Sequence, residues 1–202
     1  MKLNQDIRIC FVGDSLVNGA CDETYLGWTG RLCASANLLG VPVTYYNLGV
    51  RGNTSKDILD RWKNECSYRL PDSCDGRIVI SCGINDTVIL NGSSRIAPKV
   101  SVGNLRSIIS NSGSYKVIVV GPPPVVDIEH NKRIESLSND YRRLAQDFDI
   151  PYIDIYFPLK ADPLYKQDIV ENDKCYPQGY HPTSKGYEKI ADIVRNSIDW
   201  WF

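Results

Sequence analysis

Short apolar runs alternate along this chain with longer segments of helical pattern, and this alternation constrains the fold more than any other feature. The strand-like runs lie near residues 7–12, 42–47, 77–82, 116–121 and 151–155. The helical patterns lie near residues 26–39, 54–69, 98–111, 130–148 and 184–200. Strands that alternate with helices are typical of a parallel sheet covered by helices on both faces. We therefore expect an α/β fold of three layers, α/β/α, around a central, mainly parallel sheet of five strands.

The length and the charge of the chain limit the possible classes. Its 202 residues are enough to bury a substantial core, and the sequence contains no internal repeat, low-complexity run or block of like charge that would mark a linker. We therefore expect a single domain over residues 1–202. Lys and Arg total 23 against 24 Asp and Glu, a formal net charge of -1, so the composition predicts no nucleic-acid partner.

Cysteine usage and hydropathy indicate the compartment. The cysteines lie at positions 10, 21, 33, 66, 74, 82 and 175, without the C-x-x-C or His-Cys clusters of metal sites, so we expect no metal and no cofactor. The first strand follows Met1 too closely for a cleavable signal segment, and no apolar run approaches the ~20 residues that span a bilayer. These features predict a cytoplasmic protein with reduced thiols and no integral membrane segment.

The sequence ends in three aromatic residues, Trp200, Trp201 and Phe202. We expect these rings to pack back onto the sheet. The alternative is an exposed apolar surface, which would contact a second subunit in a homodimer or a lipid interface.

The first strand-like run stops at Gly13-Asp14-Ser15, which places a serine at the carboxyl end of a strand. In open α/β sheets that edge is where ligands bind. A serine hydroxyl becomes a useful nucleophile when a neighbouring base takes its proton, and the chain has two histidines. His130 lies in a polar stretch that leads into a helix, which favours a histidine in a solvated loop or in the first turn of that helix. His181 lies between a turn-rich loop and the start of the last helical pattern, from which it can reach a serine on another element.

Two further motifs follow strand-like runs. The first is Asn-x-Gly-x-x-Gly, which ends at Gly52, and the second is Gly-x-Asn-Asp, which contains Asn85. Alone, either motif predicts only a turn or a helix cap. Ester cleavage builds negative charge on the carbonyl oxygen, and a backbone N–H beside a glycine or an asparagine amide can stabilise that charge.

The order Gly-Asp-Ser, Asn-x-Gly-x-x-Gly, Gly-x-Asn-Asp and His-Pro resembles the GDSL or SGNH hydrolases from Phe11 to about Ile193. This resemblance implies a flavodoxin-like SGNH hydrolase fold and a serine hydrolase that acts on ester bonds. It further implies that Ser15 is the nucleophile and that His181 is the general base. The backbone N–H groups of Ser15 and Gly52 and the side chain of Asn85 would form the oxyanion hole.

The chain departs from the family pattern at the acid that orients the histidine. The family usually has an aspartate three residues before the histidine, whereas this chain has Gln178. A glutamine can accept the imidazole N–H but cannot offset the imidazolium charge. Asp173 is the nearest upstream carboxylate and would take the usual place if Lys174–Gln178 bulges outward as an insertion. We favour Asp173, while Gln178 or a Ser-His dyad without an acid remain alternatives.

Competing functions can be weighed on the same motifs. A phosphate- or flavin-binding protein is disfavoured because no Gly-x-Gly-x-x-Gly or Gly-Lys-Ser/Thr loop follows the first strand and Asp14 would repel an anion. A non-catalytic binding module is an alternative because position 178 lacks the aspartate.

Within the hydrolase interpretation we expect a small-molecule ester with a short acyl or acetyl group, since no long apolar lid segment is evident. A lysophospholipase or thioesterase is the alternative. An unperturbed imidazole at position 181 would place the rise of activity with pH near ~6.5.

Overall fold

The computed structural model describes residues 6–172 and 179–202. Its centre is a sheet of five strands in the order β2-β1-β3-β6-β7, in which every neighbouring pair is parallel. The strands are β1 (Ile7–Gly13), β2 (Val43–Gly49), β3 (Asp75–Ser81), β6 (Lys116–Val120) and β7 (Tyr152–Ile153). The order reverses at β1, because β2 lies on one side of it and β3 on the other. The carboxyl ends of β1 and β3 therefore border the crevice where ligands bind in such sheets.

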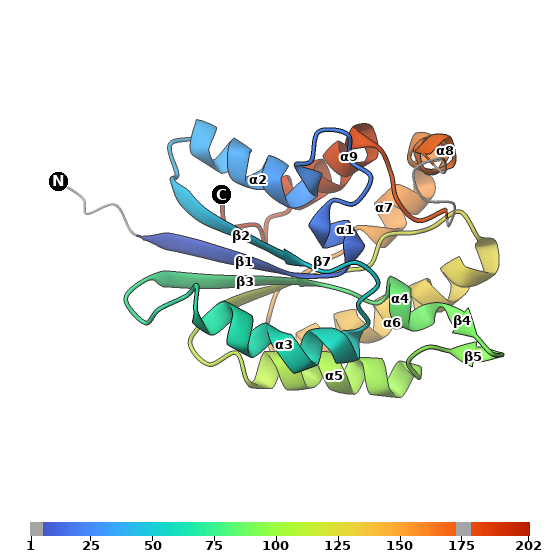
Figure 1. Ribbon diagram of the computed structural model, residues 1–202, viewed down its shortest axis with the longest axis horizontal. Helices are drawn as coiled ribbons and strands as arrows, with labels where there is room; N and C mark the ends of the chain where they lie inside the picture. The colour runs from blue at the N-terminus through green and yellow to red at the C-terminus, as the bar shows by residue number, and fades with distance from the viewer. Residues whose placement is uncertain (1–5, 173–178) are drawn as a thin grey trace.

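Helices cover both faces of the sheet, as Figure 1 shows. On one face lie α2 (Gly27–Leu38), α7 (Tyr156–Ala161), α8 (Pro163–Asn172) and α9 (Ser184–Arg195). On the other face lie α3 (Ser55–Ser67), α5 (Pro98–Ser110) and α6 (Ile128–Asp147). Two short helices and a hairpin extend the strand ends: α1 (Ser15–Asn18), α4 (Ile84–Thr87), and β4 (Ile89–Leu90) with β5 (Ser93–Ser94). The predicted three-layer α/β/α fold with a parallel sheet is thus confirmed.

Strand β1 contributes side chains to the apolar cores on both faces of the sheet, and these cores hold the two helical layers against it. Ile9 and Phe11 face one layer and belong to the core cluster that contains Trp28 of α2. Cys10 and Val12 face the other layer and belong to the second core cluster. A strand that is buried on both faces needs apolar side chains at every position, which is the pattern expected of a central parallel strand.

The predicted elements differ from the observed ones mainly in the last third of the chain. The expected strand near 151–155 is only two residues long, Tyr152–Ile153, and α7 and α8 were not predicted. The final helix ends at Arg195 instead of continuing to residue 200, because Asn196 caps it and the chain then turns. This turn brings Trp200 back onto the sheet.

The aromatic end of the chain packs against β1 and β3, as predicted. Trp200 is 8% exposed and lies in the core cluster of Phe11, with 6.4 Å between the two ring centroids. The Arg77 guanidinium lies 5.0 Å from the ring centroids of both Trp201 and Phe202. Cations within about 6 Å of a ring face are attracted by its quadrupole, so these contacts add to the apolar packing.

Cysteine chemistry corrects one prediction. Cys21 is disulfide-bonded, so the prediction of reduced thiols is wrong at this position. The reason is that cysteine positions in a sequence do not reveal which ones a fold brings together. The free thiols in the described part of the chain are Cys10, Cys33, Cys66, Cys74 and Cys82. Among the helices of residues 6–172 and 179–202, none has the length and apolar character needed to cross a membrane.

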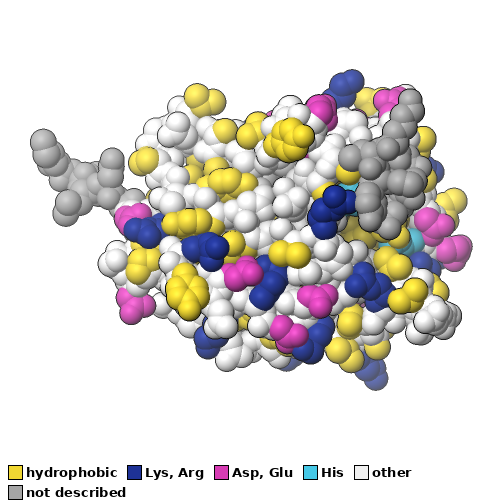
Figure 2. All heavy atoms as spheres, viewed as in Figure 1, with side chains coloured by type: hydrophobic (Ala, Val, Ile, Leu, Met, Phe, Trp, Pro, Cys, Tyr) yellow, Lys and Arg dark blue, Asp and Glu magenta, His cyan; other side chains and the backbone are white. Residues whose placement is uncertain are grey.

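Basic and acidic side chains intermingle over the face of the molecule shown in Figure 2. This distribution agrees with the formal net charge of -1.

Candidate active site

Ser15 is positioned by the end of β1. Asp14 caps the short helix α1, because its Oδ1 accepts the N–H of Leu16 at 2.9 Å, and Ser15 is the first residue of that helix. A side chain at Gly13 would place its Cβ 2.2 Å from the Ser81 carbonyl oxygen, so only glycine lets the ends of β1 and β3 approach this closely. The serine is thereby held at the carboxyl edge of the sheet.

His181 lies against Ser15. The distance from His181 Nε2 to Ser15 Oγ is 2.8 Å, although the two residues are 166 positions apart in the sequence. Both side chains are buried, with exposed fractions of 5% for His181 and 8% for Ser15. A contact of this length is within the range for proton transfer between a nucleophile and its base.

Two side chains of α8 fix the loop that carries His181. The Asp168 carboxylate accepts the N–H groups of Thr183 at 2.8 Å and Gly186 at 3.1 Å. The Asn172 amide donates to the carbonyl oxygens of Pro182 at 2.8 Å and Cys21 at 3.2 Å. Asn172 therefore ties the histidine loop to the segment that follows Ser15. Sequence reasoning missed both residues because they lie on a helix that it did not predict.

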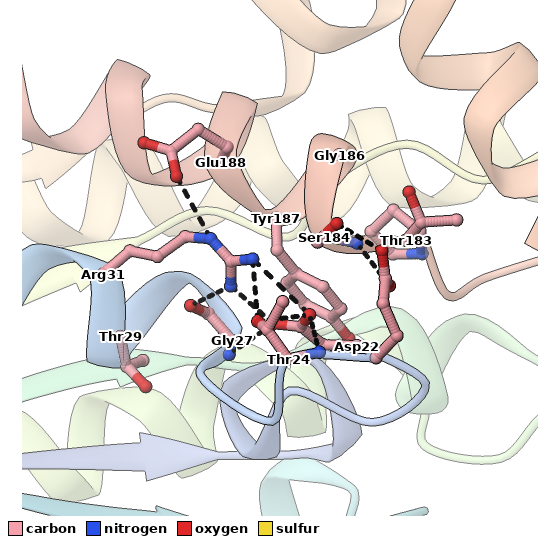
Figure 3. Close-up of polar contacts among 12 residues, drawn as sticks. Asp22, Thr24, Gly27, Thr29, Arg31, Thr183, Ser184, Gly186, Tyr187 and Glu188 are labelled. Carbon is pink, nitrogen blue, oxygen red and sulfur yellow. Dashed lines mark hydrogen bonds and ion pairs between the residues drawn. The ribbon is translucent and has the colours of Figure 1, made fainter.

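A buried ion pair adds a second link between the same two regions (Figure 3). The Arg31 guanidinium of α2 contacts the Asp22 carboxylate, donates to the Gly27 carbonyl at 2.8 Å and reaches Glu188 of α9 at 3.1 Å. Burial raises the pKa of Asp22, but hydrogen bonds from Arg31 and Thr24 outweigh it and hold that pKa below its usual value. Through its contacts with Asp22 and Glu188, Arg31 joins the segment after Ser15 to α9, the helix that follows His181.

Asn85 approaches from the end of β3. Its Nδ2 donates to the Asn53 carbonyl at 2.9 Å and lies 3.4 Å from Asp14 Oδ2. The first bond fixes the amide, whereas the second distance is too long for a strong hydrogen bond. The Asn53 contact was not predicted, since it depends on how the loop after β2 folds over α4.

Gly52 lies in the loop after β2, with a φ of 77° that favours glycine. Its carbonyl accepts Nη1 and Nη2 of Arg95, each at 3.2 Å. Gly52 and Asn85 border the same small cavity as the serine and the histidine. The described residues that line it are Ser15, Arg51, Gly52, Asn85, Arg95, Tyr180 and His181.

The volume of this cavity is about 190 Å³. Pockets that hold drug-sized ligands measure roughly 300–1,000 Å³, so this cavity is smaller than a drug-sized site. The structure thus gathers four predicted site residues, Ser15, Gly52, Asn85 and His181, around one small cavity.

Burial sets the protonation of the site. Desolvation, together with the positive charge of Arg51, lowers the pKa of His181 to about 4. The imidazole is therefore neutral, and able to accept a proton, over the whole neutral range. Burial also raises the pKa of Asp14 to about 7, with a contribution from the negative charge of Asp86.

The remaining predicted positions have different outcomes. Asp173 and Gln178, the two candidates for orienting His181, lie outside the described residues.

His130 does occupy the first turn of a helix, but the prediction that it is solvated is wrong, because it is only 3% exposed. Its Nε2 lies 2.9 Å from Thr87 Oγ1, so packing of α6 against α4 gives this ring a buried partner. Within residues 6–172 and 179–202, no group of three or more His, Cys, Asp or Glu side chains could hold a metal ion.

Solved structures share this fold. The lipase/acylhydrolase from Enterococcus faecalis has a TM-score of 0.75 and 25% identity, with 94% of this chain and 93% of that chain covered. A member of the lipolytic protein G-D-S-L family from Veillonella parvula has a TM-score of 0.68 and 21% identity, with coverage of 93% and 94%. The acetylxylan esterase Axe2 from Geobacillus stearothermophilus has a TM-score of 0.72 and 15% identity, with coverage of 96% and 94%.

Comparison of the sequence with protein families gives a match to the GDSL-like Lipase/Acylhydrolase family over residues 11–189. No match was found among curated proteins. The family match confirms the resemblance that the four motifs predicted. The chain therefore belongs to the GDSL-like Lipase/Acylhydrolase family and is an ester-hydrolysing enzyme.

Proposed function

We propose that this enzyme is a serine esterase that cleaves carboxylic esters through an acyl-enzyme at Ser15, with His181 as general base. The observation that carries the proposal is the distance of 2.8 Å between His181 Nε2 and Ser15 Oγ at the edge of a small cavity. The family match over residues 11–189 supports the accompanying proposal that residues 1–202 form one catalytic domain.

The reaction follows from the positions of these groups. Neutral His181 takes the proton of Ser15 as Oγ attacks the carbonyl carbon of the ester. Negative charge develops on the carbonyl oxygen, where the N–H groups of Ser15 and Gly52 and the Asn85 amide stabilise it. His181 then returns the proton to the leaving alcohol and activates a water molecule that hydrolyses the acyl-enzyme.

The substrate class follows from the size of the cavity. A volume of about 190 Å³ favours acetyl and other short acyl groups over the long chains that a lysophospholipase or a lipid thioesterase takes. The acetylxylan esterase with the same fold supports this assignment.

Asp173 is our proposal for the acid that orients His181. Replacement by Asn should then lower turnover much more than Gln178→Ala, and the reverse result would assign the role to Gln178.

The proposal is tested by turnover of p-nitrophenyl acetate. Ser15→Ala should lower kcat by several orders of magnitude while the circular dichroism spectrum stays unchanged. Ser67→Ala, on an exposed position of α3, is the matched control and should keep the wild-type rate. Unchanged turnover in Ser15→Ala would identify another nucleophile. Lack of turnover in the wild-type protein, on acetyl and longer esters alike, would instead support a non-catalytic binding module.

A further inference from the structure

In the part of the chain that the structure describes, the charged side chains that line the catalytic cavity are of one sign. Among the described lining residues, Arg51 and Arg95 carry positive charge and no carboxylate is present. The chain as a whole has a formal net charge of -1, so this excess is local to the site. A cavity with two guanidinium groups and a neutral imidazole favours a negatively charged ligand.

Arg95 is held in place by the hairpin that follows α4. Its backbone N–H donates to the Val88 carbonyl at 2.9 Å, and the next residue, Ile96, donates to the Asp86 carbonyl at 3.1 Å. These bonds fix Arg95 to the segment that carries Asn85. The backbone of Arg95 is therefore fixed, and its side chain lines the same cavity as Ser15 and His181.

The positive charge of Arg95 is not neutralised by an ion pair. Its guanidinium contacts the neutral Gly52 carbonyl, and within residues 6–172 and 179–202 none of the ion pairs includes it. Asp57 lies within reach of its electrostatic field. However, the Asp57 carboxylate accepts the N–H and hydroxyl of Thr54, at 2.8 and 2.7 Å, in the cap of α3. The guanidinium retains N–H groups for a ligand, because it presents five donors in a planar fork.

Arg51 lies beside Gly52 and acts on the same space. Its charge acts on the His181 imidazole, which places it near the reacting atoms. It also borders a second cavity of about 720 Å³, which is lined by the segment after Ser15. Arg51 therefore borders both the catalytic cavity and this larger one.

We propose that the enzyme acts on esters that carry an anionic group, such as a carboxylate, phosphate or sulfate, which binds Arg95 and Arg51 while the ester carbonyl lies at Ser15. A guanidinium and an oxyanion of this kind form short, charge-assisted hydrogen bonds, often in pairs. This inference rests on the proposed esterase function and adds the charge of its substrate.

The test compares each anionic ester with the neutral compound in which its carboxylate is converted to a methyl ester. One pair is 4-acetoxybenzoate and its methyl ester, in which the anion is on the leaving group. The other pair is monomethyl succinate and dimethyl succinate, in which the anion is on the acyl side. For each pair, the ratio of kcat/KM values is divided by the ratio of the hydroxide-catalysed rates, so that intrinsic reactivity cancels.

We expect the anionic member of at least one pair to be preferred about tenfold at low salt. The pair that shows the preference identifies the side of the ester that carries the charge. Because both guanidinium groups are exposed, the preference should shrink as ionic strength rises from about 0.05 M to about 0.5 M. Corrected ratios near unity for both pairs would overturn the inference, whereas failure to hydrolyse any of the four esters would count against the proposed esterase function itself.

Arg95→Gln separates substrate recognition from support of the Gly52 loop. Loss of recognition lowers kcat/KM for the anionic ester alone and brings the ratio towards unity. Loss of loop support lowers both rates by the same factor and leaves the ratio unchanged, which would contradict the inference. Arg143→Gln is the matched control, since Arg143 is an exposed residue of α6 paired with Asp140, and it should keep the wild-type ratio.

Discussion

At the scale of single residues, the environment of His181 decides how the site works. The sequence predicts an imidazole that titrates near ~6.5, whereas burial lowers its pKa to about 4. The difference comes from surrounding chain segments that bury the ring and from the charge of Arg51. Neither factor is visible in the residues next to His181, so the motif predicts the base but not its pKa.

The pH dependence of kcat/KM tests this shift. Only the neutral imidazole can accept the serine proton, and the ring becomes protonated when the pH falls below its pKa. We therefore expect a constant kcat/KM between about pH 5.5 and 8 and a decline as the pH approaches about 4. Initial rates on p-nitrophenyl acetate measure it, with circular dichroism at each pH to exclude unfolding. An acid limb with its midpoint near ~6.5 would contradict the shift.

Replacement of Asn85 tests the oxyanion hole. Asn85→Ala removes the amide that the Asn53 carbonyl holds in position. Loss of one such donor should lower kcat by about 10²–10³, or about 2.7–4 kcal/mol, with little change in KM. Asn111→Ala, at the exposed end of α5, is the control and should behave as wild type. A loss of less than threefold in Asn85→Ala would exclude the amide as an important donor.

The residues that we propose to carry the reaction were easier to predict from the sequence than the residues that support them. Ser15, Gly52, Asn85 and His181 follow strand ends or open a helix in a recognisable order. Asp168 and the other supports of the histidine loop have no such signal. Their role depends on which backbone N–H groups lie nearby in the folded chain, and a sequence pattern does not contain that information.

At the scale of elements, the long strands and helices follow from periodicity, but α7 and α8 do not. The segment from Tyr156 to Asn172 contains Pro158 and Pro163, and proline usually interrupts a helix. Both prolines lie in the first turn of a helix, and α8 begins at Pro163. A first-turn proline costs little because its missing N–H has no partner within the helix.

The contribution of α8 can be measured through Asp168. Asp168→Ala leaves the N–H groups of Thr183 and Gly186 without their acceptor. Unsatisfied buried donors should lower the free energy of unfolding by about 1–3 kcal/mol, and displacement of the His181 loop should lower kcat as well. Urea denaturation provides the first measurement and ester turnover the second.

Asp140→Ala is the control for that experiment. Asp140 forms an exposed ion pair with Arg143 on α6, and such pairs contribute about 0–1 kcal/mol. The account of α8 would be wrong if Asp168→Ala destabilised the protein no more than Asp140→Ala does.

At the scale of the whole molecule, the two helical layers leave part of β1 and β3 for the end of the chain to cover. Trp200 packs near Phe11, and Arg77 lies over the last two rings. The three consecutive aromatic residues predicted this packing. The end of α9 at Arg195 was not predicted, because the packing of Trp200 requires a turn that the helical pattern does not show.

Replacement of Trp200 tests this packing. Trp200→Ala should lower the free energy of unfolding by about 3–5 kcal/mol, since it removes a large buried side chain. Ile198→Ala is the control, because Ile198 is 99% exposed, and it should change stability by less than about 0.5 kcal/mol. Thermal unfolding measures both variants. Equal stabilities would show that the aromatic end is not part of the core in solution.

The central claim, that the Ser15 hydroxyl is activated by His181, is tested most directly by covalent labelling with a fluorophosphonate followed by intact-mass and peptide mass spectrometry. The wild-type protein should gain the mass of one phosphonyl group, on the peptide that contains Ser15. Ser15→Ala should gain none, and His181→Ala should react far more slowly. Labelling at another residue, or equal labelling rates in the wild type and His181→Ala, would contradict the claim.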